Sequence, residues 1–344
     1  MTASVRSRIG LGCLALAALL LAAPAARAEV LKIATVVPEG SAWMQDMRQA
    51  AAEIREKTQG RVQFKFYPGG VMGNDKTVLR KMRAGQLQGG AFTSGALSQI
   101  FPDLELYGAP LLLRSYGEVD YVRSRMDPDM IAGLARKGIV ALAITDAGFA
   151  YLMSQRPMSR VDDLGGAKVW IQEADVMSAK AFEIAGITPV QLSLADVYTA
   201  LQTGLVDTVT APPMGAIALQ WHTKVKYLTD FPLTYLNGVF ALDARVFGRL
   251  QPGDQRVVRE VVREVARRQD ESARVGAERA KEALRQQGIE FVAAANPEEV
   301  ERWRDIGRQT LRAMRAGSKY SDATIDALQR HLEDYRRSQD GSAD

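Results

Sequence analysis

The chain has 344 residues, with 44 Lys and Arg against 40 Asp and Glu, which gives a formal net charge of +4. It contains one cysteine, Cys13, and two histidines, His222 and His331, that lie far apart in the sequence. This composition excludes an internal disulfide and a thiolate metal site, and it gives no support for a metal site built from clustered imidazoles.

The N-terminal segment has the pattern of a secretory signal peptide. Arg6 and Arg8 precede an unbroken apolar run over residues 11–23, and Ala26-Arg27-Ala28 forms a small-x-small cleavage site. We therefore predict that residues 1–28 are cleaved and that the mature protein is exported.

The alternative for this segment is an uncleaved membrane anchor. The apolar run is shorter than the roughly 20 residues that span a bilayer, and an alternating strand pattern follows it at once. Cys13 stands at the start of the run, whereas a lipid-modified cysteine would follow it. Cleavage without lipid attachment is therefore the prediction.

Removal of this segment also changes the charge. It takes away three arginines and no acidic residue, which leaves 41 basic residues against 40 acidic ones. A protein that follows a nucleic-acid backbone needs a clustered excess of Lys and Arg. We therefore expect no nucleic-acid partner.

The first part of the mature chain alternates between strand and helix patterns. Alternating apolar residues or short apolar runs predict strands over residues 30–36, 62–66 and 90–93, and helical spacing predicts helices from Ser41 to about 58 and over 75–84. This βαβαβ order is typical of a mainly parallel sheet.

The second part continues in the same style and ends in a long helix. Strands are predicted over residues 140–144, 150–154, 168–171, 188–192 and 207–211, and helices over 175–186 and 193–203. Ser193 is the expected N-cap of the second helix, with Asp196 at its third position. From Pro252 to about residue 287, valines at helical spacing among many charges predict one long amphipathic helix whose charged face is solvated.

Catalytic and nucleotide-binding motifs are missing from the sequence. It contains no GxGxxG after the first strand, no GxxxxGK[ST], no GxSxG and no HExxH. Asp162 and Asp163 precede Gly165 and Gly166, where aspartates are favoured as turn formers. We therefore predict that the protein is not an enzyme and uses no cofactor or metal.

Several blocks carry a family resemblance, in the same order and at similar spacing. They are Glu56-Lys-Thr-Gln-Gly-Arg-Val62, Tyr67-Pro-Gly-Gly-Val-Met-Gly73, Asp162-Asp-Leu-Gly-Gly-Ala-Lys-Val-Trp170, Ala185-Gly-Ile-Thr-Pro-Val190 and Asp196-Val-Tyr-Thr-Ala-Leu-Gln-Thr-Gly-Leu-Val-Asp207. With them the chain resembles the periplasmic solute-binding proteins of TRAP transporters, the dicarboxylate-binding-protein-like family.

The resemblance implies an α/β fold of two lobes, with a ligand cleft between the lobes and a long bridging C-terminal helix. It assigns residues 29–150 and about 240–280 to lobe I, and residues 151–239 and about 281–344, with the C-terminal helices, to lobe II. It also implies that the protein closes on a small solute and passes it to TRAP membrane permease subunits, driven by an ion gradient. A ligand-sensing role without transport is the functional alternative.

Ligands in open α/β folds generally lie at the ends of strands, in the crevice between the two halves. With the resemblance, this rule predicts ligand-binding residues at Trp43, Met72, Phe92, Thr93, Phe149, Trp170, Gln172, Glu173, Pro213, Met214, Trp221 and Asn237. Phe92 and Phe149 fit a place in the core equally well.

The sequence departs from the family pattern at Trp170, where most members carry an arginine that pairs with a substrate carboxylate. Two further polar positions of the family fall near Ala150 and Ala211, and no arginine lies between Arg160 and Arg245. A carboxylate buried in the cleft without a cation would cost several kcal/mol, so a simple dicarboxylate is disfavoured.

Two ligand classes stay open. One is a larger and mostly apolar molecule that stacks on Trp170 near Met214 and Trp221. The other is a small mono- or dicarboxylate, held by first-lobe groups, by backbone donors or by a bound cation. Lys168 is a possible substitute for the arginine if its strand is regular.

Overall fold

A computed structural model describes residues 28–173, 175–317 and 319–340 of the chain. The predicted signal peptide lies outside the described residues except for Ala28. The predicted first strands and helices are present as β1 (Glu29–Ala34), α2 (Ala42–Lys57), β2 (Val62–Tyr67), α3 (Asp75–Arg83) and β3 (Gly89–Thr93). The Ser41 side chain caps α2 by accepting from the Met44 amide at 3.2 Å, because the first amides of a helix have no partner inside it.

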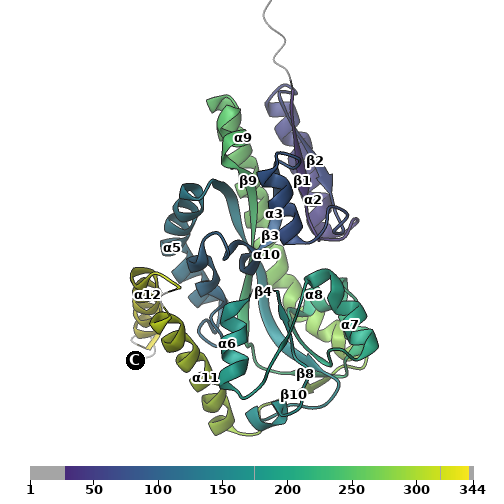
Figure 1. Ribbon diagram of the computed structural model, residues 1–344, viewed down its shortest axis with the longest axis vertical. Helices are drawn as coiled ribbons and strands as arrows, with labels where there is room; N and C mark the ends of the chain where they lie inside the picture. Colours follow the sequence, from purple (N-terminus) through teal and green to yellow (C-terminus); the bar gives the residue numbers. More distant parts are fainter. Residues whose placement is uncertain (1–27, 174, 318, 341–344) are drawn as a thin grey trace, which may run out of the picture.

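The sheet is mixed: the predicted parallel arrangement holds for its N-terminal part, the middle of the sheet is antiparallel, and its last two strands pair in parallel again. Strand β1 pairs in parallel with β2 and β3. Strand β9 (Thr234–Asp243) then lies antiparallel to β3 on one side and to β4 (Ile139–Ser154) on the other. The full order is β10-β8-β4-β9-β3-β1-β2, where β8 is Tyr227–Thr229 and β10 is Glu290–Val292, and β7 (Thr208–Ala211) is also paired to β4. The two long strands therefore join the upper and lower parts of the molecule in Figure 1.

The two strands predicted at residues 140–144 and 150–154 are one strand, β4. Its pairing with β9 shifts register between Asp146 and Gly148, and Gly148 has φ of 90°. A bulge bends a strand without ending it, and a glycine accepts the left-handed conformation. The polar residues in the middle of the pattern therefore mark a bend and not a loop.

The predicted strands and helices of the lower part are present as β5 (Trp170–Gln172), α6 (Val176–Ile184), β6 (Val190–Leu192), α7 (Val197–Thr203) and β7. The sequence did not predict η2 (Val161–Leu164), η3 (Leu194–Asp196), α8 (Pro213–Ala218), η4 (Trp221–Lys224), β8 (Tyr227–Thr229) or β10 (Glu290–Val292). Ser193 stands at the N-cap position of η3, but its side chain does not cap the helix. The Ser193 hydroxyl donates to the Asp196 carboxylate at 2.6 Å, and the 3₁₀ turn η3 precedes α7.

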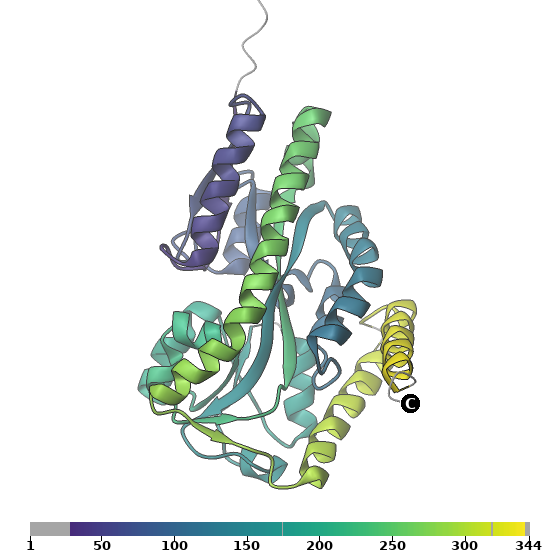
Figure 2. The same cartoon turned by 180° about the vertical axis from the view of Figure 1, so that it is seen from behind.

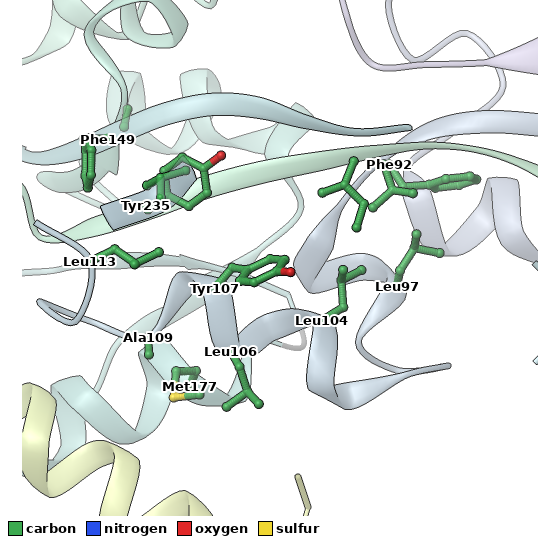
Figure 3. Packing of buried hydrophobic residues seen from close by; sticks show 14 of the residues in the cluster. Phe92, Leu97, Leu104, Leu106, Tyr107, Ala109, Leu113, Phe149, Met177 and Tyr235 are labelled. Atoms are coloured by element: carbon green, nitrogen blue, oxygen red, sulfur yellow. The ribbon is translucent and has the colours of Figure 1, made fainter. Parts of the chain in front are cut away.

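The sequence patterns did not reveal the helical segments between β3 and β4. These are α4 (Ser94–Leu97), η1 (Pro102–Gly108) and α5 (Tyr116–Arg136), and α5 contains Pro128. Figure 3 shows Tyr107 of η1 inside the core near Tyr235 of β9, with Phe149 beside Tyr235. The Phe149 and Tyr235 rings lie 5.6 Å apart, edge to face. Both tyrosines are fully buried, so this core holds η1 against the two long strands.

The predicted long helix is α10 (Pro252–Gln286), preceded by the short α9 (Ala244–Arg249). At 1.5 Å per residue it is about 52 Å long. Its valines at 258, 261, 262 and 265 are buried, and the helix packs against α2, β4 and α8. Figure 2 shows it crossing from the upper to the lower part of the molecule.

Two C-terminal helices complete the fold. Helix α11 (Pro297–Ala316) packs against α6, and α12 (Asp322–Asp340) packs against α5, as Figure 1 shows. Within the described ranges, no helix combines the length and the apolar character that a bilayer crossing requires.

Candidate functional site

A cavity of about 530 Å³ lies where several strand ends meet. The carboxyl ends of β3, β5 and β7 reach it, and so do the middle of β4 and of β9. Helices α8 and α10 contribute further wall residues. The cavity is therefore built by the N-terminal sheet and by the lower part of the molecule together.

Ten of the twelve residues predicted from the sequence line this cavity. They are Trp43, Phe92, Thr93, Phe149, Trp170, Gln172, Pro213, Met214, Trp221 and Asn237. Phe92 and Phe149 are also part of the large hydrophobic core, being 3 % and 7 % exposed, so they serve as core and as cavity wall at once.

The other two predicted residues do not line the cavity. The Met72 backbone carbonyl accepts from the Lys81 ammonium at 2.9 Å, and its side chain packs against the core. Glu173 is exposed and forms an ion pair with Lys76 at 3.7 Å. The loop position of Met72 and the strand-end position of Glu173 therefore did not bring their side chains to the cavity.

Trp170 and Trp221 form an aromatic wall. Their ring centroids lie 5.1 Å apart in a T-shaped arrangement, which suits the charge distribution of aromatic rings. The Trp170 indole Nε1 donates to the Leu192 carbonyl at 3.1 Å. Trp170 is only 6 % exposed, so its ring is fixed by strand β6 on one side and by Trp221 on the other.

Three polar atoms of cavity-lining residues have no hydrogen-bond partner among the described residues. They are Asn237 Nδ2, Thr210 Oγ1 and Trp303 Nε1, and all three atoms are buried. Ser94 donates to the backbone carbonyl of Asn237, which holds the strand but leaves the side-chain amide unpaired. Buried polar groups are normally paired. These three groups are therefore candidates to bind a ligand.

Two polar contacts join opposite sides of the cavity. Gln172 Nε2 on β5 donates to Thr93 Oγ1 at the end of β3, at 2.6 Å. The second contact is the ion pair between Lys76 of α3 and Glu173, the residue that follows Gln172. Thr93 Oγ1 also donates to Asp75 at 3.0 Å. This part of the lower half is thereby tied to the N-terminal sheet.

Lys168 is not the cation of this cavity. Its side chain is exposed, and its ammonium donates to the Gly204 carbonyl at 2.9 Å. Among the described residues, the one basic side chain that lines the cavity is Lys281 of α10. Sequence reasoning missed it because Lys281 belongs to a charged helix face that was interpreted as solvated.

Lys281 is largely buried beside an aromatic ring. Its side chain is 13 % exposed, and its ammonium lies 4.6 Å from the centre of the Tyr151 ring. Glu278 pairs with it at 3.2 Å, but the Glu278 side chain is 79 % exposed. Burial opposes the charged form, but hydrogen bonds with Tyr151 and Glu278 outweigh it and raise the pKa of Lys281. The group is therefore a cation at neutral pH.

Acidic groups outnumber this lysine at the cavity wall. They are Glu105, Asp146, Asp175 and Glu278. Burial and the neighbouring Glu105 carboxylate raise the pKa of Asp175 to about 7. Glu105 itself accepts from the Tyr320 hydroxyl at 2.6 Å, which links the wall to the segment before α12.

A second charged network fastens α10 to the bend of β4. Arg274 pairs with Asp146 at 2.9 Å and with Asp120 at 2.7 Å, and Asp270 accepts from the Asp146 amide at 2.7 Å. Burial raises the pKa of Asp146 and raises that of Asp270 to about 6. The same bend carries Gly148 and Phe149 to the cavity. In residues 28–173, 175–317 and 319–340, no three His, Cys, Asp or Glu side chains come together as a possible metal site.

Comparison with known proteins gives this geometry a family. The model of the bacterial extracellular solute-binding proteins, family 7, matches residues 33–317. The C4-dicarboxylate-binding periplasmic protein of Rhodobacter capsulatus is 26 % identical over 285 residues, which cover 77 % of this chain and 84 % of the relative.

Solved structures show the same two-lobed architecture. A TRAP periplasmic solute-binding protein from Ochrobactrum anthropi superposes with a TM-score of 0.78 at 25 % identity, covering 91 % of this chain and 97 % of that one. A sugar acid binding protein from Advenella mimigardefordensis, in complex with galactonate, superposes with a TM-score of 0.83 at 18 % identity, covering 90 % and 99 %. Since the family model spans most of the sequence, the chain belongs to the bacterial extracellular solute-binding proteins of family 7, the family of TRAP transporter solute-binding proteins.

Proposed function

We propose that this protein is the periplasmic solute-binding component of a TRAP transporter, and that it binds one small organic ligand with a largely apolar body. In this role it delivers the ligand to membrane permease subunits. Its place in the family supports the transport role, and the cavity supports the ligand class.

The aromatic wall carries the proposal about the ligand. The family resemblance places Trp170 where most members carry an arginine, and Trp221, Phe92 and Phe149 extend the apolar surface around Trp170. Apolar and aromatic walls with a few placed polar groups are typical of sites for small organic molecules. A ligand with a sizeable hydrocarbon or ring portion gains most from such a wall.

A small organic acid of a non-standard kind is the second candidate. Related proteins of the same fold were solved with galactonate, with L-gulonate and with pyroglutamic acid. The presence of Lys281 at the cavity favours an acid over a neutral molecule. An organic acid with a large apolar part would belong to both candidate classes.

Hinge closure is the proposed mechanism. The lobes would be residues 29–150 with about 240–280, and residues 151–239 with about 281–344. Strands β4 and β9 and helix α10 run between them, and the contact of Gln172 with Thr93 closes one side of the cavity. Movement about a few residues in long connecting elements is a common way to enclose a ligand.

Native mass spectrometry of the protein purified from the periplasm of its own host tests this function directly. We expect a complex with one small molecule, whose mass and fragments identify it, and a higher melting temperature for that compound in a thermal-shift assay. A protein that carries no ligand and is stabilised by no compound in a broad set of organic acids and apolar molecules would contradict the proposal.

A further inference from the structure

Among the described residues, Lys281 supplies the one positive charge at the cavity wall, and it comes from an unexpected element. Lys281 belongs to α10, the helix that crosses between the two parts of the molecule, and not to the strand that carries Trp170. Its ammonium lies against Tyr151 of β4 at 4.6 Å. Tyr151 is the direct cross-strand neighbour of Ala211, at the end of β7. The ammonium group therefore lies close to β4 and β7. The polar positions that the family resemblance implies on these strands fall near Ala150 and Ala211, which are apolar.

We propose that Lys281 is the carboxylate anchor of this cavity, and that the ligand is a monocarboxylate with an apolar body. The proposal rests on the function proposed above and names the chemical class of its ligand.

The partner of Lys281 supports this assignment. Glu278 is 79 % exposed, and a carboxylate that is so well solvated gains little from an ion pair. Lys281 is 13 % exposed, so a carboxylate arriving from the cavity side meets a cation with little water around it. A ligand acid can therefore take the place of Glu278 as the partner of the ammonium group.

The charges around the cavity limit the ligand to one acid group. Apart from Lys281, the charged side chains that the described structure places at the wall are Glu105, Asp146, Asp175 and Glu278. Asp146 is already paired with Arg274, and Glu105 accepts from the Tyr320 hydroxyl. A second carboxylate on the ligand would meet acids and no further cation, which disfavours a dicarboxylate.

The unpaired groups of the cavity indicate one more polar atom on the ligand. Asn237, 5 % exposed, presents an amide nitrogen without a partner, and the hydroxyl of Thr210 and the indole nitrogen of Trp303 are also unpaired among the described residues. An amide nitrogen donates, so it fits a hydroxyl or keto oxygen of the ligand. Much of the remaining wall is aromatic or aliphatic and fits the apolar body of the ligand.

Isothermal titration with matched acids and amides tests the anchor. The probes are indole-3-acetate, 3-phenylpropionate and 4-phenylbutyrate, each with its primary amide, together with phenylsuccinate as a dicarboxylate. We expect wild-type protein to bind at least one acid about ten-fold or more tightly than its amide, and to prefer it to phenylsuccinate. Lys281→Met should bind that acid and its amide about equally, and Lys281→Arg should restore part of the preference.

Lys224→Met is the matched control. Its ammonium lies 5.2 Å from the Tyr198 ring, a similar lysine–tyrosine arrangement, but Lys224 is not among the residues that line the cavity. This variant should keep the preference for the acid. Far-ultraviolet circular dichroism establishes that each variant is folded.

The outcomes separate the anchor from the transport role. If folded Lys281→Met protein still prefers the acid over the amide, Lys281 is not the carboxylate anchor. Wild-type protein that binds only neutral molecules, or binds phenylsuccinate best, also overturns it but leaves the solute-binding role in place. Wild-type protein that binds neither these probes nor any molecule from its host overturns both.

Discussion

The indole nitrogen of Trp170 donates to the carbonyl oxygen of Leu192 at 3.1 Å, across the small sheet formed by β5 and β6. This hydrogen bond uses the one polar group of the tryptophan. The ring therefore presents only carbon surface to the cavity, at the place where an arginine would present five donors. The proposed ligand preference of the protein rests on this tryptophan in place of the arginine that the family resemblance implies.

Trp170→Arg should change that preference. We expect the variant to bind succinate about ten-fold or more tightly than wild-type protein does, because a guanidinium group can pair with a carboxylate at two points. Titration calorimetry with succinate measures the change. Trp170→Phe, which keeps an aromatic ring but adds no charge, is the control and should not gain affinity. Tight succinate binding by wild-type protein, with no gain in a folded Trp170→Arg variant, would show that the missing charge is not what sets the ligand class.

Asn237→Leu should separate stability from binding. The side-chain nitrogen of Asn237 is buried without a partner, and such a group costs about 1–3 kcal/mol in the folded state. We expect the ligand-free variant to be at least as stable as wild-type protein in urea, because leucine of similar size removes the unpaired donor. Affinity for the ligand eluted from the native protein should fall.

The matched comparison is Thr58→Val, which replaces a buried, hydrogen-bonded hydroxyl by a methyl group. The Thr58 hydroxyl donates to the Ile54 carbonyl at 2.7 Å, so this variant should lose stability and keep its affinity. Unchanged ligand affinity in Asn237→Leu would argue against a direct contact with the ligand.

Gln172→Leu should speed ligand release. It removes the hydrogen bond to Thr93 Oγ1 across the cavity, and one hydrogen bond is worth about 1 kcal/mol, or a roughly five-fold change in rate. Stopped-flow tryptophan fluorescence can follow release, since Trp43, Trp170 and Trp221 line the cavity.

Glu173→Gln is the control for this prediction. Its ion pair with Lys76 joins side chains that are 46 % and 67 % exposed, and exposed pairs contribute little. The release rate of this variant should stay close to that of wild-type protein. Equal rates in both variants would mean that the Gln172 contact does not hold the cavity closed.

Asp175 should make stability depend on pH. Its pKa rises from the ordinary 3.8 to about 7 in the folded protein, because burial and Glu105 disfavour the carboxylate. The folded state thus holds the proton more tightly than the unfolded chain does. The contribution of Asp175 to stability is complete below about pH 4 and is lost as the pH rises through about 7.

Asp175→Asn isolates this effect, because asparagine is also a good N-cap for α6. The unfolding free energy of wild-type protein should fall relative to that of the variant between about pH 4 and pH 7, as measured by urea denaturation. Parallel pH profiles for wild-type protein and Asp175→Asn would refute the assignment.

The sequence by itself determined many of the local elements and, with the family resemblance, part of the cavity wall. Residue spacing identified β1, α2, β2, α3 and β3, and it predicted the long α10 with the correct start at Pro252. Strand ends together with the resemblance pointed to ten residues that line the cavity. These features are encoded by period and by turn residues, which depend only on neighbours in the chain.

Only the tertiary structure decided the pairing of β4 with β9 and the position of Lys281. The bulge at Asp146 hid a single long strand behind two short patterns, because a register shift interrupts the alternation without ending the strand. Helical periodicity shows that Lys281 lies on a charged face of α10, but it does not show which elements pack against that face. The packing of α10 against β4 and α8 brings this lysine to Tyr151 and the cavity. No local pattern can specify a contact between residues 130 positions apart in the sequence.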